Sequence, residues 1–324
     1  QLEVIKAMDG NLLEDNKIHL GFRDGISQPR IEGIDSDAHP NNIVATGEFL
    51  LGYKNEYGVY PDAPFMNKEQ GDVSLLPLDP GGSGKRNLGV DGSYLVYRKM
   101  EEKVDQFWEY INEQTKTQNG ELDIDESVKL ASKMVGRWPN GSPLAKYPDK
   151  MPDGVSDDDD FGYQPDDKEG LKCPFGSHMR RCNPRNAFED NNPRLSIKLT
   201  KKHRIIRRGR SYGEPLVSTP TDHVTKGEIG LHFMCVNADI SDQFEFIQHT
   251  WANFPRFQNL YDDPDPITGT RDIPMTGEQL IQNFTVQAEP VNKTYSNLPQ
   301  FVTVKGGAYF FLPSITTIRY LSTI

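Results

Sequence analysis

The pattern of hydrophobic positions along the chain predicts a small set of strands and helices. Apolar residues alternate with polar ones, or run together over strand length, at residues 93–98, 231–236, 301–304 and 308–312. Two further stretches, residues 104–111 and 244–251, place apolar side chains at helical spacing. The order strand, helix, strand, helix, strand is that of a split βαβ, ferredoxin-like unit. We therefore predict an α+β fold with an antiparallel sheet and peripheral helices.

Turn and capping residues support these bounds. An Asp91-Gly92 turn precedes the first strand, and Asp239 or Ser241 can cap the second helix. The last two strands are separated by Gly306-Gly307.

Two long segments, residues 47–92 and 139–172, are rich in polar and turn-forming residues and predict loops. The second contains an acidic run at residues 157–160. Such a run is most often a solvated loop, and the alternatives are a cation site or a surface that attracts cationic substrates.

The composition narrows the function classes. The 324 residues include 36 basic and 47 acidic side chains, a net charge of −11, which argues against a nucleic-acid binder. No stretch approaches the ~18 consecutive apolar residues of a membrane span. Three cysteines give no disulfide framework and suit a reducing compartment. No signal segment can be read, so the cytoplasm is the default location.

The strongest chemical signal is the neighbourhood of His178, one of seven histidines. The absence of an HExxH helix excludes a zincin, and the absence of GxSxG weakens a hydrolase of that class. His178 lies in CPFGSHMRRCNPR, closely followed by Arg180 and Arg181, which could meet an anionic ligand. These are groups that bind haem, since its iron takes imidazole and its propionates take arginine.

Two other segments carry candidate residues. In GFRDGISQP, residues 21–29, two glycines flank a charged pair, which predicts a tight turn that exposes Asp24. Taken alone, Asp24 fits equally a turn residue that only satisfies backbone donors. The segment IIRRGRSYG, residues 205–213, holds three of the seven residues of the only basic concentration, including Arg207 and Arg208.

Together these segments resemble the motifs of the dye-decolorizing peroxidases, in their large, long-loop class. CPFGSHMRRCNPR is similar to the proximal-histidine motif, GFRDGISQP to the GxxDG motif, and IIRRGRSYG to the segment that supplies the distal arginine. Residues 230–251, 265–269 and 301–313 add further similarity, so the resemblance covers most of the chain in the right order. It implies the dimeric α+β barrel superfamily, with ferredoxin-like domains, and haem b as the cofactor.

The resemblance also implies roles for single residues. His178 matches the ligand of the haem iron, and Asp24 the distal acid–base residue. Arg207, rather than Arg208, matches the arginine that stabilises charge during heterolysis of the O–O bond. A carboxylate can move the proton between the two peroxide oxygens, and a guanidinium stays charged at any working pH.

Three further positions are implied around the cofactor. Asp265 resembles the acidic partner that orients the proximal imidazole, with Asp262 and Asp263 close by as alternatives. Leu231 and Phe233 resemble the apolar residues that wall the distal pocket.

The activity implied by the resemblance is the oxidation of phenols and bulky dyes by hydrogen peroxide. Trp108, Trp138 and Trp251 could pass electrons from substrates too large to enter, although such residues more often serve packing. A haem-binding or haem-handling protein with incidental peroxidase activity is the alternative, because it would share only the iron ligand. A structural shell component or cargo adaptor finds no support in residues 321–324.

The chain departs from the family at its start. Only about twenty residues precede GxxDG, where family members have most of a first ferredoxin-like domain. We expect residues 1–40 to be the C-terminal remnant of that domain, and residues 41–324 to form the second, haem-binding domain with long loop insertions. A separately encoded or cleaved partner chain, proteolysis and truncation are competing explanations. We expect a partner polypeptide that supplies the missing half-domain, with a homo-oligomer as another assembly.

Overall fold

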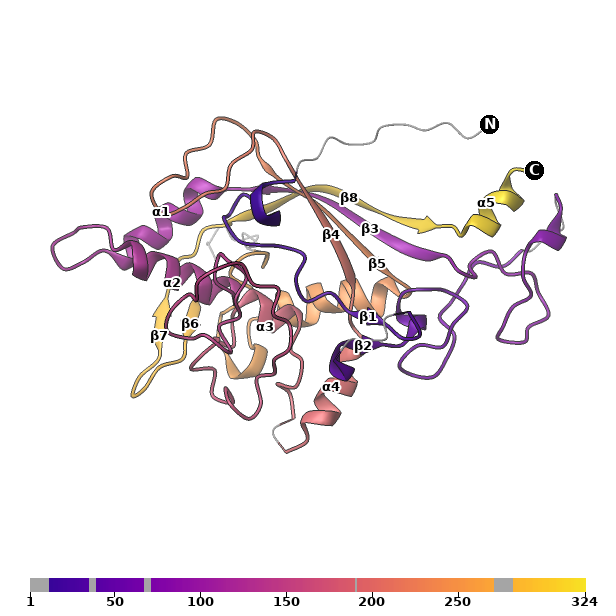
Figure 1. Ribbon diagram of the computed structural model, residues 1–324, viewed down its shortest axis with the longest axis horizontal. Helices are drawn as coiled ribbons and strands as arrows, with labels where there is room; N and C mark the ends of the chain where they lie inside the picture. The colour runs from indigo at the N-terminus through magenta and orange to yellow at the C-terminus, as the bar shows by residue number, and fades with distance from the viewer. Residues whose placement is uncertain (1–11, 35–38, 67–70, 190, 271–281) are drawn as a thin grey trace, which may run out of the picture.

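A four-stranded antiparallel sheet in the order β4-β5-β3-β8 forms the centre of the protein (Figure 1). The computed structural model describes residues 12–34, 39–66, 71–189, 191–270 and 282–324. The strands are β1 (Arg30–Ile31), β2 (Ile43–Val44), β3 (Ser93–Glu102), β4 (Ile206–Tyr212), β5 (Gly230–Asn237), β6 (Phe284–Val286), β7 (Lys293–Tyr295) and β8 (Val302–Leu312). Helical segments join β3 to β4 and β5 to β8, which is the ferredoxin-like arrangement. The predicted fold class is therefore confirmed.

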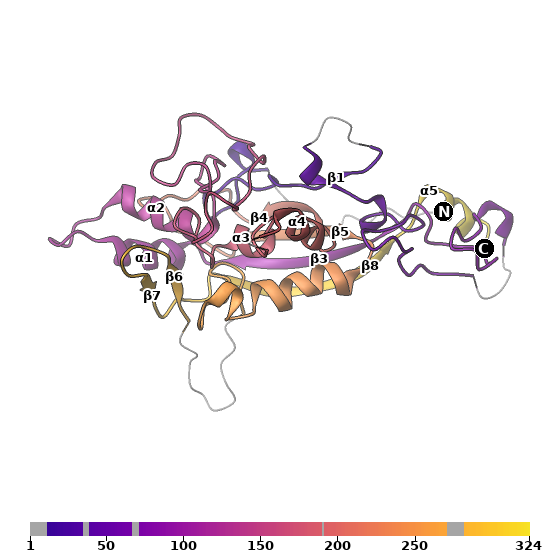
Figure 2. The ribbon, with the colours of Figure 1, turned by 90° about the horizontal axis from the view of Figure 1, so that it is seen from below.

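The helices of the described residues are short. The α-helices are α1 (Val104–Thr115), α2 (Ile124–Val135), α3 (His178–Cys182), α4 (Pro193–Lys201) and α5 (Ile315–Leu321). The π-helices η5 (Ile240–Glu245) and η6 (Ile247–Ala252) follow β5 and run along the sheet in Figure 2. Single 3-10 turns are η1 (Glu14–Asn16), η2 (Pro40–Asn42), η3 (Thr46–Glu48), η4 (Val73–Leu75) and η7 (Phe257–Asn259). None of these helices is both long enough and apolar enough to span a membrane.

Strand β8 is continuous, whereas the sequence predicted two strands around a pair of glycines. Lys99 of β3 pairs with Gly306 and Met100 with Val304, so Lys305 is an extra residue in the ladder. A bulge of this kind bends a strand without ending it. The glycines therefore mark an irregularity within one strand.

Several elements were not predicted. Strand β4 carries three arginines and a glycine, which hide any apolar alternation. The helices α2, α4 and α5 were missed as well. The predicted helix at residues 244–251 exists as part of η5 and η6, and Asp239 is its cap, since its carboxylate accepts the N–H of Asp242.

Residues 16–24 form a hairpin that is anchored in the main hydrophobic core. The N–H of Ile18 donates to the carbonyl of Phe22 at 2.9 Å. Leu20 and Phe22 are 1% and 2% exposed and belong to the core cluster that includes Trp108 of α1. The rings of Phe22 and Trp108 are stacked, with centroids 6.5 Å apart. The hairpin is thus held by this chain's own core, while the predicted boundary at residue 40 lies beside residues outside the described ranges and stays a prediction.

The two faces of the sheet differ. On one face Val96 packs in a cluster with Phe244 of η5. On the other, the register aligns Ile206, Val236, Leu95 and Phe310 side by side across all four strands; we call this the apolar row. Phe310 is 50% exposed, and none of the hydrophobic clusters of the described residues includes the apolar row. In Figures 1 and 2 the helices gather on the opposite side of the sheet.

The acidic run at residues 157–160 is a loop, as predicted, and every acid in it has a basic neighbour. The partners are Arg23 for Asp157, Lys146 for Asp158, Arg137 and Arg185 for Asp159, and His39 for Asp160. Of these four acids, Asp159 is the most buried, with 18% of its side chain exposed. Its contacts with the guanidinium groups of Arg137 and Arg185 are therefore the ones least screened by solvent. The run therefore ties distant segments together.

Glu102, at the end of β3, provides a pH-dependent test of this fold. It is 4% exposed, and its Oε2 accepts the N–H of Leu20 at 3.2 Å. Burial raises the pKa of Glu102 to about 8. Because this lies above the unfolded value of ~4.3, the folded chain holds an extra proton between the two, and its stability falls as the pH rises through that window.

We predict that Glu102→Gln flattens the fall in the free energy of unfolding between pH ~5 and ~8, by up to a few kcal/mol. Urea unfolding at a series of pH values measures this, with the exposed Glu109→Gln as control. Buried Glu48, whose pKa is raised to about 7, leaves a residual slope in both variants. Identical pH profiles for the Glu102 variant and the wild type would show that this carboxyl does not titrate as described.

Candidate active site

His178 opens the short helix α3, and Asp265 fixes the orientation of its ring. Nδ1 of His178 lies 2.8 Å from Oδ2 of Asp265 and donates its proton to it. Asp265 is 0% exposed, and its Oδ1 accepts the N–H groups of Ile267 and Thr268 at 2.9 and 2.8 Å. Nε2 of His178 has no hydrogen-bond partner in the described part of the chain, and 31% of the side chain is exposed. This nitrogen is therefore available to a ligand.

His178 and Asp265 shift each other's pKa. Burial by itself lowers the pKa of His178, but Asp265 and then Cys182 raise it well above its ordinary value. Burial by itself raises the pKa of Asp265, but His178 brings it below its ordinary value. A carboxylate bound to one ring nitrogen makes the other nitrogen a stronger metal ligand. Within the described residues, Asp262 and Asp263, the alternative partners, make no hydrogen bond of this kind with His178.

Cys182 lies one helical turn after His178 and completes a group with metal-ligand chemistry. Its Sγ is 3.7 Å from Nδ1 of His178 and 4.0 Å from Oδ2 of Asp265. The ligand atoms of the three residues all lie within 4.8 Å of one another. The hydrogen bond between Nδ1 and Asp265 occupies two of these atoms, which leaves Nε2 as the nitrogen for a metal.

Arg180 and Arg181 are enclosed by the protein, and their binding of an anionic cofactor stays a prediction. Both are 0% exposed. Nη1 of Arg180 donates to Oδ2 of Asp167 at 2.8 Å, and Nη1 of Arg181 to the carbonyls of Trp251 and Phe254 at 2.6 and 3.1 Å. A buried guanidinium without partners is costly, so both use protein oxygens. They anchor α3 in the structure.

Asp24 and Arg207 meet as an ion pair. Nη1 of Arg207 lies 3.1 Å from Oδ1 of Asp24, and their side chains are 30% and 24% exposed. Nη2 of Arg207 donates to the carbonyl of Ile26 at 3.0 Å. Asn16 holds the backbone of Asp24 from the other side of the hairpin, accepting its N–H at 3.0 Å and donating to its carbonyl at 2.8 Å. Arg208, the next residue on β4, lies on the opposite face of the sheet and is exposed.

The sheet surface beneath Asp24 is shaped by Gly209 and Leu231. A Cβ at Gly209 would lie 2.8 Å from Oδ2 of Asp24 and 3.0 Å from Cδ1 of Leu231, so only glycine leaves room for the carboxylate. Leu231 and Asp24 line a cavity of about 10 Å³, roughly the space that one water needs. Phe233 lies opposite Gly209, with its ring 6.0 Å from that of Phe244. The roles of Leu231 and Phe233 as pocket walls stay predictions.

Asn183, just after α3, is a candidate that the sequence reasoning missed. It is 8% exposed, and neither Nδ2 nor Oδ1 has a hydrogen-bond partner in the described ranges. A buried amide with both ends unpaired is costly unless a ligand or water satisfies it. The only signal in the sequence was its place in the segment CPFGSHMRRCNPR, five residues after His178.

The three tryptophans are packed in the interior. Trp108, Trp138 and Trp251 are 1%, 4% and 5% exposed. Nε1 of Trp108 donates to Oγ of Ser218 at 2.8 Å, and Nε1 of Trp138 to the carbonyl of Tyr147 at 2.7 Å. Packing and hydrogen bonding account for these residues, and their role in electron transfer stays a prediction.

Comparison with known proteins gives consistent matches. No protein-family model matches the chain. A multifunctional dye peroxidase of Amycolatopsis sp. is 31% identical over 312 residues, which cover 94% of this chain and 60% of that protein. A solved ancestral D-type dye-decolorizing peroxidase has a TM-score of 0.71 at 28% identity, covering 96% of this chain and 64% of its own. Another, described as having an engineered haem pocket for asymmetric sulfoxidation, has a TM-score of 0.72 at 27% identity over 95% of this chain and 65% of its own. The chain thus spans about 60% of the length of the curated relatives that it matches.

The pairing of His178 with Asp265 can be tested directly. We predict that Asp265→Asn lowers the pKa of His178, because burial is then opposed by Cys182 alone. A histidine titration by NMR in the haem-free protein measures this, with the exposed Asp262→Asn as matched control. If the pKa of His178 stays high in Asp265→Asn, another group must hold its proton.

Proposed function

We infer that this chain, which is related in sequence and in fold to the dye-decolorizing peroxidases, carries the active site of a haem peroxidase. The observation that carries the proposal is the pair of contacts His178–Asp265 and Asp24–Arg207. Four segments that are distant in the sequence supply these residues, and each residue matches the role that the resemblance implies. Haem-handling without peroxide chemistry would need only the iron ligand, so the Asp24–Arg207 pair favours the enzyme.

The residues present fit a haem, which we propose to be haem b. His178 offers a free Nε2 backed by a buried carboxylate, and Asn183 offers a buried amide with both ends unpaired. The amide of Asn183 could hydrogen-bond a polar substituent of the haem ring. When bound, haem would supply the iron that takes peroxide and the redox capacity for reducing it.

Asp24 and Arg207 would manage the proton and the charge of peroxide cleavage. Arg207 binds Oδ1 of Asp24, while Oδ2 lies over Gly209 beside the small cavity. Asp24 would accept a proton from one peroxide oxygen and deliver it to the other, which leaves as water. The fixed guanidinium would stabilise the negative charge that develops on the leaving oxygen. Hydrogen peroxide and aromatic reductants such as phenols and bulky dyes are the proposed substrates.

Matched variants test this assignment. We predict that His178→Ala abolishes the Soret band of the haem-loaded protein. Asp24→Asn and Arg207→Leu should keep that band but lower peroxide turnover by ~10²–10⁴-fold, since each removes one transition-state function. Absorbance spectra and steady-state oxidation of a phenol measure both effects.

The controls are exposed residues of the same types. Arg208→Leu follows Arg207 on β4 but lies on the other face, and Asp153→Asn removes an exposed carboxylate. Full peroxide turnover in both Asp24→Asn and Arg207→Leu would contradict the assignment.

We further propose that a polypeptide segment covers the apolar row, as the missing half-domain of a two-domain enzyme. The relatives are longer than this chain, which spans 60% of the Amycolatopsis protein. The apolar row crosses all four strands, and Phe310 within it is 50% exposed. Contiguous exposed apolar surface of this kind is typical of an interface.

The proposed covering segment leads to a prediction about the protein as purified from its natural source. Intact-mass measurement with N-terminal sequencing should find additional polypeptide, attached or associated, and Phe310→Lys should weaken its association. The exposed Ile315→Lys on α5, away from the row, is the control. A stable monomer of these 324 residues that binds haem fully would refute the covering segment.

A further inference from the structure

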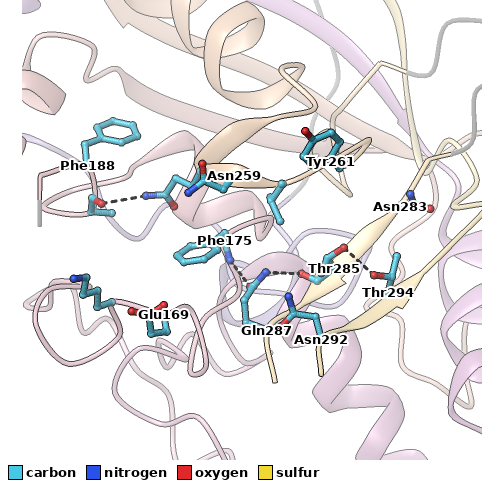
Figure 3. A pocket seen from close by; sticks show the side chains of 14 residues that line it. Glu169, Phe175, Phe188, Asn259, Tyr261, Asn283, Thr285, Gln287, Asn292 and Thr294 are labelled. Atoms are coloured by element: carbon cyan, nitrogen blue, oxygen red, sulfur yellow. Dashed lines mark hydrogen bonds between the residues drawn. The ribbon is translucent and has the colours of Figure 1, made fainter. Parts of the chain in front are cut away.

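A second cavity lies apart from the candidate active site. Its volume is about 980 Å³, at the upper end of the ~300–1,000 Å³ usual for small-molecule sites. Figure 3 shows it between the segment at residues 258–261, the loop at residues 168–175 and the hairpin β6–β7. His178, Asp24 and Arg207 are not among its lining residues.

The lining is polar but almost without charge. It contains five amide side chains, two threonines and one tyrosine, with a single acid and a single base, both exposed. The neutral polar residues are Gln258, Asn259, Asn283, Gln287, Asn292, Thr285, Thr294 and Tyr261. Phe175, Phe188 and Tyr261 add aromatic surface. Neutral hydrogen-bonding groups beside aromatic rings favour a ligand that is itself neutral and carries both polar groups and an apolar face.

Some of these polar groups hydrogen-bond to other groups of the protein, whereas others have no partner among the described residues. Oε1 of Gln287 accepts the N–H of Phe175 at 3.0 Å, and the hydroxyls of Thr285 and Thr294 are 3.1 Å apart, as the dashed lines in Figure 3 show. By contrast, Oε1 of Gln258 and Oδ1 of Asn283 are buried acceptors without a partner in the described part of the chain. Buried acceptors of this kind need donors, which a ligand with hydroxyl groups supplies.

The backbone of one wall is held in an unfavourable conformation. Gln258, Asn259 and Asp262 have positive φ values of 48°, 67° and 51°. Residues other than glycine rarely adopt this region, and where they do the surrounding structure must enforce it. The strained segment carries Gln258, Asn259 and Tyr261, which all line the cavity.

We propose that this cavity binds a neutral carbohydrate of two or more linked sugar rings. Sugar hydroxyls both donate and accept hydrogen bonds, so they match amides and threonines, while the faces of sugar rings pack on aromatic side chains. A simple phenol has too few hydroxyl groups to satisfy five amides. The near absence of charge disfavours anions. The site would attach the protein to a saccharide without using the peroxidase residues.

The experiment is a binding titration with cellotetraose, xylotetraose and maltotetraose, followed by saturation-transfer NMR on the haem-loaded protein without peroxide. We expect at least one of them to bind. Asn283→Leu removes an unpaired acceptor at similar size, and Tyr261→Ala removes an aromatic wall; each should raise Kd about tenfold. Tyr147→Ala, a partly exposed tyrosine outside the cavity, is the matched control and should leave Kd unchanged.

Three results would overturn the proposal: no binding of any tetrasaccharide, binding that persists unchanged in both variants, or cavity-dependent binding of 2,6-dimethoxyphenol instead. Circular dichroism and the Soret band of each variant establish that it is folded. Because no peroxide is used, failure of the carbohydrate site leaves the peroxidase assignment untouched. A loss of peroxidase activity in Asp24→Asn would likewise leave carbohydrate binding intact.

Discussion

The pairing of β3 with a neighbour on each edge is the interaction on which the rest of the structure depends. Its register with β5 sets the register of β4, and this brings Gly209, Leu231 and Arg207 to the same face of the sheet. The helix that follows β3 carries Trp108, against which the hairpin bearing Asp24 packs. A slip of one residue would turn every side chain of a strand to the other face. The register that keeps Gly209, Leu231 and Arg207 on one face of the sheet therefore also fixes the ion pair between Asp24 and Arg207.

Much of this arrangement could be predicted from the sequence, and the failures have physical causes. The ferredoxin-like order followed from the apolar patterns of β3, α1, β5 and β8 along the sequence. Strand β4 was not predicted because three of its seven residues are arginines, and a local pattern cannot reveal that Arg207 pairs with Asp24. For the same reason the protein partners of Arg180 and Arg181 could not be predicted, since Asp167 and the carbonyl of Trp251 reach them only in the folded chain. Asn183 was missed because an unpaired amide is a property of three-dimensional packing alone.

The two sides of the candidate site are held by different means. His178 begins a helix of only five residues, too short to be stable alone, so the buried guanidinium groups of Arg180 and Arg181 in the same helix fasten it to the protein. Asp24 instead depends on a hairpin whose apolar residues enter the main core. One side is thus anchored by buried charge and the other by hydrophobic burial. These anchors respond differently to temperature, because hydrophobic stabilisation weakens on cooling.

The apolar row has a consequence for how such a protein is made. In a newly synthesised chain whose four strands have paired, the apolar row is exposed unless another polypeptide covers it. Two such chains can bury their apolar rows against each other. The rate of this association grows with concentration, whereas the rate at which an attached segment docks does not. The outcome of assembly therefore depends on the relative rates of these two processes. Under the proposal of a covering segment, slow synthesis and covalent attachment of that segment favour native assembly, whereas rapid synthesis at high concentration favours aggregation.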